Sequence, residues 1–459
     1  MNMVQIAHSK SKEEKLLRVL FIALIFSVMN AFLFNVVLPV ISIEFNLSAA
    51  QVSWILSGYM IVYAFGTVIY GKLADKYRLK DLLTFGLLLF ALGSVIGLVT
   101  TQYWMIILGR VIQASGASVI PAMAMIIPVR YFSQEKRGRA LGMTAAGMAL
   151  GTALGPIVSG LVADLTGWRF LFCLSLLPLI TIPFFRKYLD DERGSIGKID
   201  FIGGTLLAGT VTLLLLAVTQ GNGLLIFAGL ILLALFILRI FSTTDPFIDP
   251  DIFKNKKYSW GLIITFLAAA LIFGIQFLSP LFLADINHLS PLVIGLVMFP
   301  PAIVSALLGR SGGKLADKKG NSYLVYIAIL LIFVCYVLLS TFVGVSPITI
   351  MLLLTFGSAG TTFMRIGITN TISRTLSKEQ IGVGMGFFSM FNFISGAAVT
   401  SLIGKMLDFN SSGFRFNPVP SESATFVYSN IFVMLAFIAV IAAALYYLQF
   451  GANAKRLMN

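Results

Sequence analysis

Charged residues are scarce in this chain, at 11% of 459 residues, whereas hydrophobic residues make up 58%. A soluble domain carries about 25% charged residues, so this composition excludes an ordinary soluble protein. Cysteine and histidine are scarcer still. Cys173 and Cys335 both lie in apolar segments, and His8 and His288 are far apart in the sequence. These residues therefore predict neither a disulfide nor a metal site.

Two further absences bear on function. The chain has no nucleotide-binding loop of the form G-x-x-x-x-G-K-[ST] and no recognisable nucleophile–base constellation. We therefore expect neither an enzyme nor a pump driven directly by ATP, and no cofactor. The net charge of +14 would indicate nucleic acid for a soluble protein. Membrane proteins, however, collect Lys and Arg on their cytoplasmic side, so no nucleic-acid partner is predicted.

Long apolar runs fill most of the sequence. A bilayer core of about 30 Å needs about 20 apolar residues per helix. Fourteen segments meet this requirement, the first near 17–41 and the last near 426–449. No cleavage site follows the first segment, which indicates a retained helix. Because lipid offers no hydrogen bonds to an open backbone, the sequence predicts an all-α integral membrane protein with 14 transmembrane helices.

The distribution of basic residues predicts the orientation of these helices. With the N-terminus in the cytoplasm, only Arg169, Lys405 and Arg415 of the 33 Lys and Arg residues fall on the outer side. Arg110 and Arg365 lie within helices, and all the others fall on the inner side. Such asymmetry predicts cytoplasmic N- and C-termini in a multi-pass plasma-membrane protein. The inner charge also suits contact with anionic membrane lipid.

The hexapeptide GKLADK occurs twice, at Gly71–Lys76 and Gly313–Lys318, each time between apolar segments. The predicted topology places both copies in cytoplasmic loops, which indicates an internal duplication of the kind found in secondary transporters. Glycine permits close helix approach, and aspartate can accept hydrogen bonds from a helix N-terminus or pair with an arginine. The alternative is a pair of basic turns that only set topology. The expected gate residues are Gly71, Asp75, Gly313 and Asp317.

Several motifs resemble those of the major facilitator superfamily. Both GKLADK loops resemble the family's loop motif, although Arg78 stands where the family usually has Gly. The segment Arg110–Gly116 resembles the family's R-x-x-Q-G motif, whose arginine is tied to coupling. Residues 142–160 resemble the antiporter motif of exporters. That resemblance implies close packing and bending of the fifth helix at Gly151, Gly155 and Pro156.

Further segments narrow the resemblance to the 14-helix drug-export branch. Gly167–Phe172 and Thr244–Pro250 look like that branch, and Asp285–Ser290 and Val427–Asn430 are similar to the Gram-positive tetracycline efflux proteins. The resemblance implies the major facilitator fold in a bacterial protein, with two helices inserted between two six-helix halves. The expected divisions are a six-helix bundle at 1–200, two inserted helices at 201–241 and a second six-helix bundle at 242–459.

Acidic residues are missing from the middle of every predicted helix. The tetracycline exporters carry acids where this chain has Ala31, Val40, Thr152 and Gly396, so a strongly cationic substrate is not expected. Asp285, at the outer end of the ninth helix, is the surviving acid at a family position. It is either a coupling residue or an ordinary solvated carboxylate.

Two cations and several polar residues lie within the predicted helices. An arginine at depth is costly unless it is solvated or paired. We favour a coupling role for Arg110 over a structural one. Arg365 either contacts an anionic or polar substrate group or extends to the membrane interface. The expected cavity residues are Asn30, Asn35, Tyr59, Gln113, Thr152, Gln276, Arg365, Asn370 and Asn392.

These features lead to a functional hypothesis. The chain is expected to be a secondary-active exporter that moves small amphipathic compounds outward by alternating access, in exchange for protons. Arg110 and Asp285 are the expected coupling residues. Two alternatives stay open: export of an anionic endogenous metabolite or lipid, and a non-transporting sensor on the same fold.

Overall fold

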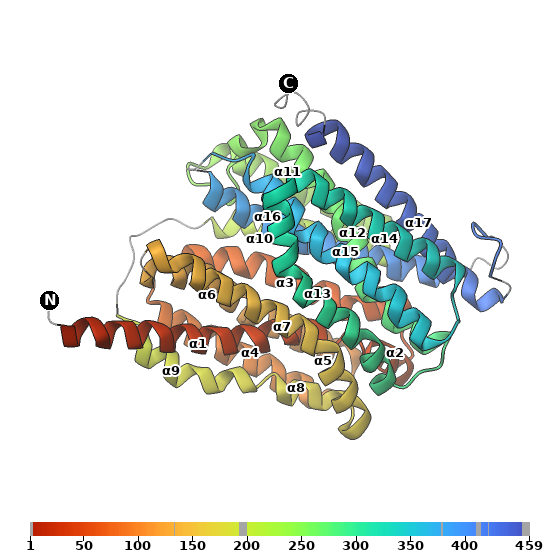
Figure 1. The fold of residues 1–459 in the computed structure, drawn as a ribbon, viewed down its shortest axis with the longest axis horizontal. Helices are drawn as coiled ribbons and strands as arrows, with labels where there is room; N and C mark the ends of the chain where they lie inside the picture. Colours follow the sequence, from red (N-terminus) through yellow and green to blue (C-terminus); the bar gives the residue numbers. More distant parts are fainter. Residues whose placement is uncertain are drawn as a thin grey trace.

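The computed structural model describes residues 3–132, 134–191, 200–377, 380–409, 415–420 and 422–451 (Figure 1). Some loops used to predict the orientation, at 192–199, 378–379 and 452–459, lie outside these ranges. The described residues form helices, turns and loops, with no strand among them. They include 14 helical stretches that are long and apolar enough to cross a membrane. The predicted fold class and number of spans are therefore confirmed.

Proline shapes the helices of the N-terminal part. The predicted first segment, 17–41, is not one helix, because α1 ends at Leu33 and α2 begins only at Leu38, with Pro39 in its first turn. Proline lacks an N–H, so the first turn of a helix tolerates it best, because the N–H groups of that turn have no intrahelical partner. The elements are α1 (Met3–Leu33), α2 (Leu38–Phe45), α3 (Ala49–Leu73), α4 (Leu79–Leu98), α5 (Tyr103–Ala117), α6 (Val119–Tyr131), α7 (Gln134–Thr166), η1 (Trp168–Phe170), α8 (Leu171–Leu174), η2 (Leu177–Thr181) and α9 (Ile182–Tyr188).

The C-terminal part consists mainly of long helices. They are α10 (Phe201–Gln220), α11 (Gly223–Ser242), η3 (Pro250–Lys254), α12 (Lys256–Asp285), α13 (Pro291–Lys319), α14 (Asn321–Thr341), α15 (Pro347–Ser373), α16 (Ile381–Asp408), α17 (Ser423–Tyr446) and the π-helical turn η4 (Tyr447–Gly451). In Figure 1, α1, α4, α5, α8 and α9 lie in the lower part, and α11, α12, α14 and α17 lie in the upper part.

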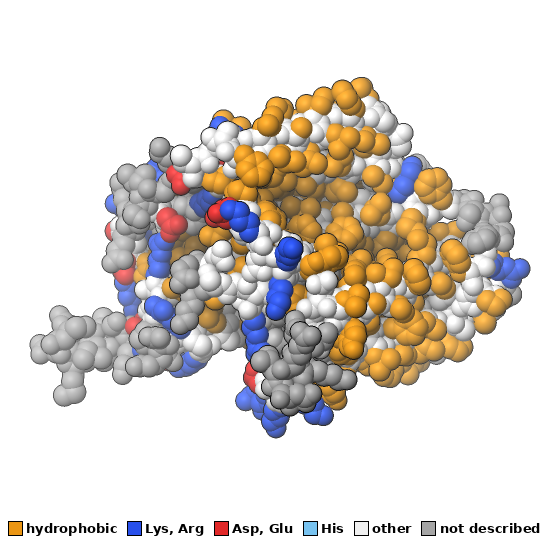
Figure 2. Space-filling view, turned by 90° about the horizontal axis from the view of Figure 1, so that it is seen from above, with side chains coloured by type: hydrophobic (Ala, Val, Ile, Leu, Met, Phe, Trp, Pro, Cys, Tyr) orange, Lys and Arg blue, Asp and Glu red, His pale blue; other side chains and the backbone are white. Residues whose placement is uncertain are grey.

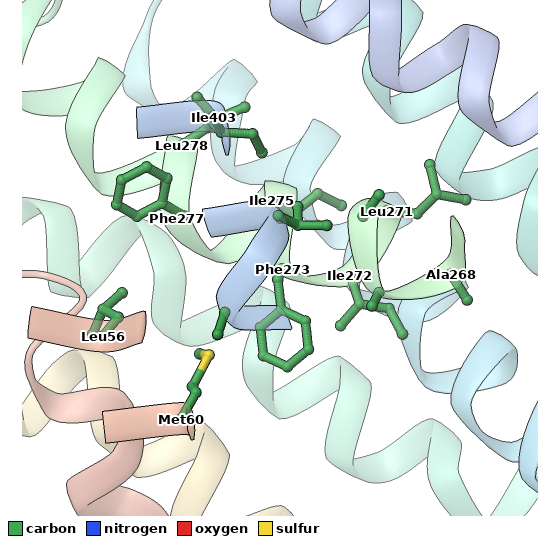
Figure 3. Close-up of a cluster of buried hydrophobic side chains, with 14 of the residues drawn as sticks. Leu56, Met60, Ala268, Leu271, Ile272, Phe273, Ile275, Phe277, Leu278 and Ile403 are labelled. Carbon is green, nitrogen blue, oxygen red and sulfur yellow. The ribbon is translucent and has the colours of Figure 1, made fainter. Parts of the chain in front are cut away.

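The most enclosed span is α12. Its side chains are buried along almost its whole length, as expected for a helix with apolar residues on all sides. Figure 3 shows its Phe273 beside Met60 of α3 and its Leu278 beside Ile403 of α16. The buried core therefore joins helices from both ends of the sequence.

The helices α10 and α11 lie at the periphery. Trp54 of α3 donates a hydrogen bond to Thr219 of α10 (3.1 Å), but most of α11 is uncovered. Asp200 anchors the pair, because its carboxylate accepts from the backbone N–H of Gly203 (3.0 Å) and from Arg239 at the end of α11 (3.2 Å). The uncovered side of α11 carries large apolar side chains suited to lipid.

Figure 2 shows hydrophobic side chains over the middle and right of the molecule and most Lys and Arg side chains toward the left and centre. Both GKLADK copies lie at one end of the bundle, here called the basic end. The other end, where Ser48 meets Asp408 and Gly160 meets Pro291, is called the closed end. The two copies lie at the same end, as predicted, but the second lies within α13 and not in a loop.

Candidate functional site

A pocket lies between helices from the two parts of the chain. It encloses an empty space of about 620 Å³, including its open mouth. Its walls are mostly apolar, with a few amide and hydroxyl groups and no charged residue. This composition is typical of sites for small organic molecules. The lining residues are Phe32, Asn35, Thr152, Pro156, Ile272, Ile275, Gln276, Ser279, Met298, Pro301, Ala302, Ser305, Leu354, Ser358 and Thr361.

Three of the expected cavity residues, Asn35, Thr152 and Gln276, meet in this pocket. Asn35 lies in the turn between α1 and α2, so the break in the first span is what brings its amide to the wall. The side-chain oxygens of Asn35 and Gln276 are buried and have no hydrogen-bond partner among the described residues. A buried polar atom without a partner is costly, so these two oxygens are available to a ligand.

Small residues close one end of this pocket. A Cβ added to Gly160 of α7 would lie 2.4 Å from the carbonyl oxygen of Pro291, and one added to Gly295 of α13 would lie 2.7 Å from that of Pro156. Only glycine permits such close approach of two helix backbones. On the other side, Ser57 of α3 donates to the carbonyl of Ala397 in α16 (3.1 Å). The helices α7, α13, α3 and α16 therefore seal the closed end.

The helices α7 and α13 separate toward the basic end. Gly142 lies about five turns from Gly160, and Gly313 lies about five turns from Gly295, so each shares the face of its partner glycine. A Cβ added to Gly142 or Gly313 would meet no atom within 4 Å. Faces that touch at the closed end are thus apart at the basic end. The close approach expected at Gly71 and Gly313 is likewise not present in this conformation.

A second polar cluster is centred on Arg110 of α5, which is only 1% exposed. Its guanidinium lies between the rings of Phe34 (4.3 Å to the ring centre) and Tyr59 (3.9 Å). It donates hydrogen bonds to the side-chain oxygens of Asn30 (3.1 Å) and Gln113 (3.0 Å). Its Nη2 has no partner, and no described carboxylate contacts it.

This cluster gathers Arg110 with three of the expected cavity residues, Asn30, Tyr59 and Gln113. None of these four lines the pocket. They form a separate buried network, in which Asn30 also donates to Ser175, just after α8, and Gln113 donates to Ser94 of α4 (2.8 Å). The guanidinium is thus stabilised by cation–π contacts and amide oxygens, and not by a carboxylate.

The remaining expected cavity residues lie on α15 and α16. Arg365 of α15 is exposed, and Asn370 of α15 and Asn392 of α16 are half-buried. No hydrogen bond or ion pair joins the Arg365 side chain to any described residue. Ser305, Ser358 and Thr361 line the pocket but were not among the expected residues. The sequence could have indicated Ser358 and Thr361, because their spacing from Leu354 places these three residues on one face of α15.

Comparisons with known proteins agree with this architecture. Residues 20–400 match the model of the Major Facilitator Superfamily. The chain belongs to the major facilitator superfamily.

Relatives in this superfamily include several named for resistance or transport. The chain is 29% identical over 307 residues to the riboflavin transporter RibZ of Clostridioides difficile, which covers 65% of this chain and 67% of the relative. It is 26% identical to the methylenomycin A resistance protein of Bacillus subtilis, covering 72% of each chain. It is also 26% identical to the lincomycin resistance protein LmrB of Listeria monocytogenes, covering 78% and 79%.

Solved structures of the superfamily share the fold. A bacterial homologue of the human lysosomal transporter Spinster, in an inward-facing unoccupied conformation, has a TM-score of 0.67 at 14% identity and covers 95% of this chain and 97% of its own. The peptide transporter POT in complex with sulfate has a TM-score of 0.68 at 16% identity, with 95% of each chain covered. The chain is therefore a multi-pass plasma-membrane transporter of this superfamily and not an enzyme.

The antiporter-motif residues of this superfamily member lie where α7 packs on α1. A Cβ added to Gly151 would lie 2.6 Å from the carbonyl oxygen of Ile25, and one added to Gly155 would lie 3.1 Å from Cβ of Phe32. Pro156 lines the pocket and contacts Gly295 of α13 through its carbonyl. These residues thus place α7 between α1 and the opposite part of the molecule.

The two superfamily loop motifs differ in conformation despite their identical letters. In the first copy α3 ends at Leu73, and Asp75 accepts from Arg130 at the end of α6 (2.8 Å). Arg130 also donates to the carbonyl of Ala74 (3.0 Å), which stabilises the turn. The second copy lies wholly within α13, and Asp317 is exposed with no ion-pair partner among the described residues. Tertiary contacts, and not the six letters, decide the local structure.

Acidic residues of this transporter lie at the ends of its spans. Asp285 is exposed at the last residue of α12, outside the pocket, and accepts a hydrogen bond from the Tyr428 hydroxyl (2.5 Å). Glu44, between the first two spans, accepts from Trp168 (2.7 Å) and Arg169 (2.5 Å). Burial alone raises the pKa of Glu44, but the hydrogen bonds from Arg169 and Trp168 outweigh it and hold that pKa below its ordinary value.

Proposed function

We propose that this protein is a secondary-active exporter that carries small amphipathic compounds out of the cell in exchange for protons. The observation that carries the proposal is the pocket between the two parts of the chain, which is sealed at the closed end and has separated helices at the basic end. Alternating access requires one such state and a second one in which the ends exchange roles. The names of the methylenomycin and lincomycin resistance relatives favour outward transport.

The proposal includes an orientation and a division of the chain. Residues 1–200 and 242–459 form the two six-helix bundles that rock about the pocket, and 201–241 form an inserted pair. The basic end faces the cytoplasm, as the distribution of Lys and Arg predicts. The GKLADK copies then belong to the cytoplasmic gate, with Gly71 and Gly313 meeting other helices only when that end closes.

Arg110 and Asp285 are the proposed coupling residues. Arg110 carries a buried charge without a carboxylate partner, so its hydrogen-bond network can respond to a proton or substrate that comes near it. Asp285 is a titratable group shared between α12 and α17 through Tyr428. No described acid lies mid-membrane, so the coupling proton is proposed to act from the end of the bundle.

Reconstitution into liposomes with an internal pH dye tests the proposal. Lincomycin, methylenomycin A and riboflavin are the first compounds to offer, because relatives carry their names. Compound-dependent proton movement is the expected result. Flux without proton movement would contradict the antiport mechanism, and no flux of any compound would favour a non-transporting sensor.

Two variants test the coupling assignment in the same assay. Arg110→Ala leaves the oxygens of Asn30 and Gln113 without their donor, and Asp285→Asn removes the titratable group but keeps the acceptor for Tyr428. Each is expected to lower proton movement more than substrate binding. Asp164→Asn is the matched control, because Asp164 is exposed at the end of α7 with no ion-pair partner among the described residues. Unchanged coupling in both variants would refute the assignment.

A further inference from the structure

Arg365 lies on the face of α15 that lines the pocket. It follows Thr361 by one helical turn and Ser358 by two, so all three side chains project in nearly the same direction. Neighbours on the other faces of α15 confirm this direction: Gly367 packs on Val325 of α14, and Gly312 of α13 packs on Ile366. The large exposed apolar residues of α15, Leu352 and Phe356, lie on the opposite face, as lipid-facing residues should.

Arg365 lies well inside its span. Its side chain is exposed, and the residue lies about 12 Å from the end of α15. It has no hydrogen bond and no ion pair with the part of the chain that the structure describes. A guanidinium at this depth is stable only when water or an anion solvates it.

The charges around the pocket all have the same sign. The lining residues are uncharged, and every described Asp or Glu within a span lies in its first or last turn. Arg110, which is buried but does not line the pocket, is a second positive charge that no described carboxylate contacts. In a medium of low dielectric constant, two such charges favour an anion and oppose a cation strongly.

We propose that the pocket selects amphipathic substrates that carry an anionic group, which Arg365 binds, and a hydrogen-bonding group, which the amides of Asn35 and Gln276 bind. The inference rests on the proposed transport function and names its substrate class. A guanidinium binds carboxylate, phosphate or sulfonate through two parallel hydrogen bonds, which a neutral or cationic group cannot accept in the same way. The apolar wall then holds the rest of the molecule.

Two dyes with the same xanthene core but opposite charge test the selectivity. Fluorescein is the anionic probe and rhodamine 123 the cationic one. Binding of each to the full-length protein in detergent is measured by fluorescence anisotropy, which needs no transport. We expect fluorescein to bind the native protein at least about tenfold more tightly than rhodamine 123. Equal binding of the dyes, tighter binding of rhodamine 123, or binding of neither would overturn the proposal.

Variants of Arg365 test whether this residue binds the anionic group of fluorescein. Arg365→Gln is expected to weaken fluorescein binding at least about tenfold without weakening that of rhodamine 123. Arg365→Lys keeps the charge but loses the planar fork, so it should fall between the two. Arg374→Gln is the matched control, because Arg374 lies on the opposite face at the end of the same helix. Unchanged fluorescein binding in a folded Arg365→Gln or Arg365→Lys protein would refute the assignment; elution volume and melting temperature establish folding.

The source of the anion is a separate arm of the experiment. Short-chain phosphatidylglycerol that displaces fluorescein from the native protein supports a lipid headgroup as the anion, and failure to displace it supports a soluble one. Transport in liposomes then distinguishes the proposed transport function from the proposed substrate class. Charge-selective binding without flux contradicts the proposed function alone, whereas flux of both dyes without charge selectivity contradicts this inference alone.

Discussion

Substitution of Asp408 gives the clearest test of alternating access, because this residue joins α16 to α3 at the closed end. Its carboxylate accepts hydrogen bonds from the hydroxyl of Ser48 (2.8 Å) and from the backbone N–H groups of Ala49 (2.8 Å) and Ala50 (3.2 Å). These donors form the N-terminus of α3, where the helix dipole also favours a negative charge. Asp408→Ala removes all three of these hydrogen bonds.

The free energy that Asp408→Ala removes follows from the exposure of Asp408 and from the capping of α3. Hydrogen bonds to a charged group contribute about 1.5–3 kcal/mol in total when sheltered, and the exposed Asp408 belongs at the low end of that range. Ser48 and Gln51 already form a reciprocal capping box on α3, so the helix keeps its own cap. The lost hydrogen-bond free energy therefore weakens the contact between α3 and α16 and not the helix α3 itself. A change of about 1.4 kcal/mol raises the population open at this end about tenfold.

A cysteine-labelling assay measures that population. In a background with Cys173 and Cys335 replaced by serine, Ser401→Cys introduces a thiol in the sealed contact between α16 and α3, where Ser401 donates to Ser57 (2.9 Å). A membrane-impermeant maleimide should label this thiol about tenfold faster when Asp408 is alanine. Asp408→Asn, which keeps an acceptor but loses the charge, should give an intermediate rate.

Two outcomes would refute the reasoning. A labelling rate within about twofold of the reference would mean that Asp408 does not hold the closed end together. A large drop in melting temperature, with faster labelling throughout the protein, would mean that the carboxylate stabilises the fold and not one conformation. Asp164→Ala, a change to an exposed carboxylate near the same end, controls for the loss of charge.

Three further predictions concern other contacts. Asp200→Ala should lower the free energy of unfolding by about 2 kcal/mol in chemical denaturation, because it removes a helix cap and the partner of Arg239, and Asp200→Asn should recover part of this loss. Gly160→Leu should open the closed end and accelerate labelling about tenfold or more, because no side chain fits against Pro291. The lowered pKa of Glu44 stabilises the fold above the ordinary carboxyl range, and this contribution is lost as pH falls through that pKa; Glu44→Gln should therefore flatten the acid side of the melting-temperature profile. Unchanged denaturation curves, unchanged labelling or parallel pH profiles would contradict these three in turn.

Much of the fold could be predicted because membrane insertion is a local property. The apolar length of each segment decides whether it spans, so the number of spans is correct and the helical class is confirmed. Breaks within spans were harder to place. The length of the turn that brings Asn35 into the pocket depends on how α2 packs on α3 and α12.

The expected cavity residues were polar side chains within spans, and this rule does not distinguish a pocket wall from a buried network. Asn35, Thr152 and Gln276 line the pocket, whereas Asn30 and Gln113 serve Arg110 behind it. Whether a polar residue lines the pocket or binds Arg110 depends on the rotation of its helix and on the helices that pack beside it. The oxygens of Asn30 and Gln113 have a donor in Arg110, whereas those of Asn35 and Gln276 have no partner among the described residues, and polarity alone does not distinguish these cases.

The sequence by itself determined the spans, the duplicated GKLADK motif, the uneven placement of Lys and Arg and the lack of mid-membrane acids, because each follows from the cost of placing a residue in lipid. Only the tertiary structure decided which helices touch. It showed that Asp408 joins α16 to α3, that one GKLADK copy turns while the other stays helical, and that Arg365 lies on the face of α15 that lines the pocket. These features depend on helix contacts between distant segments, which no local pattern of residues encodes.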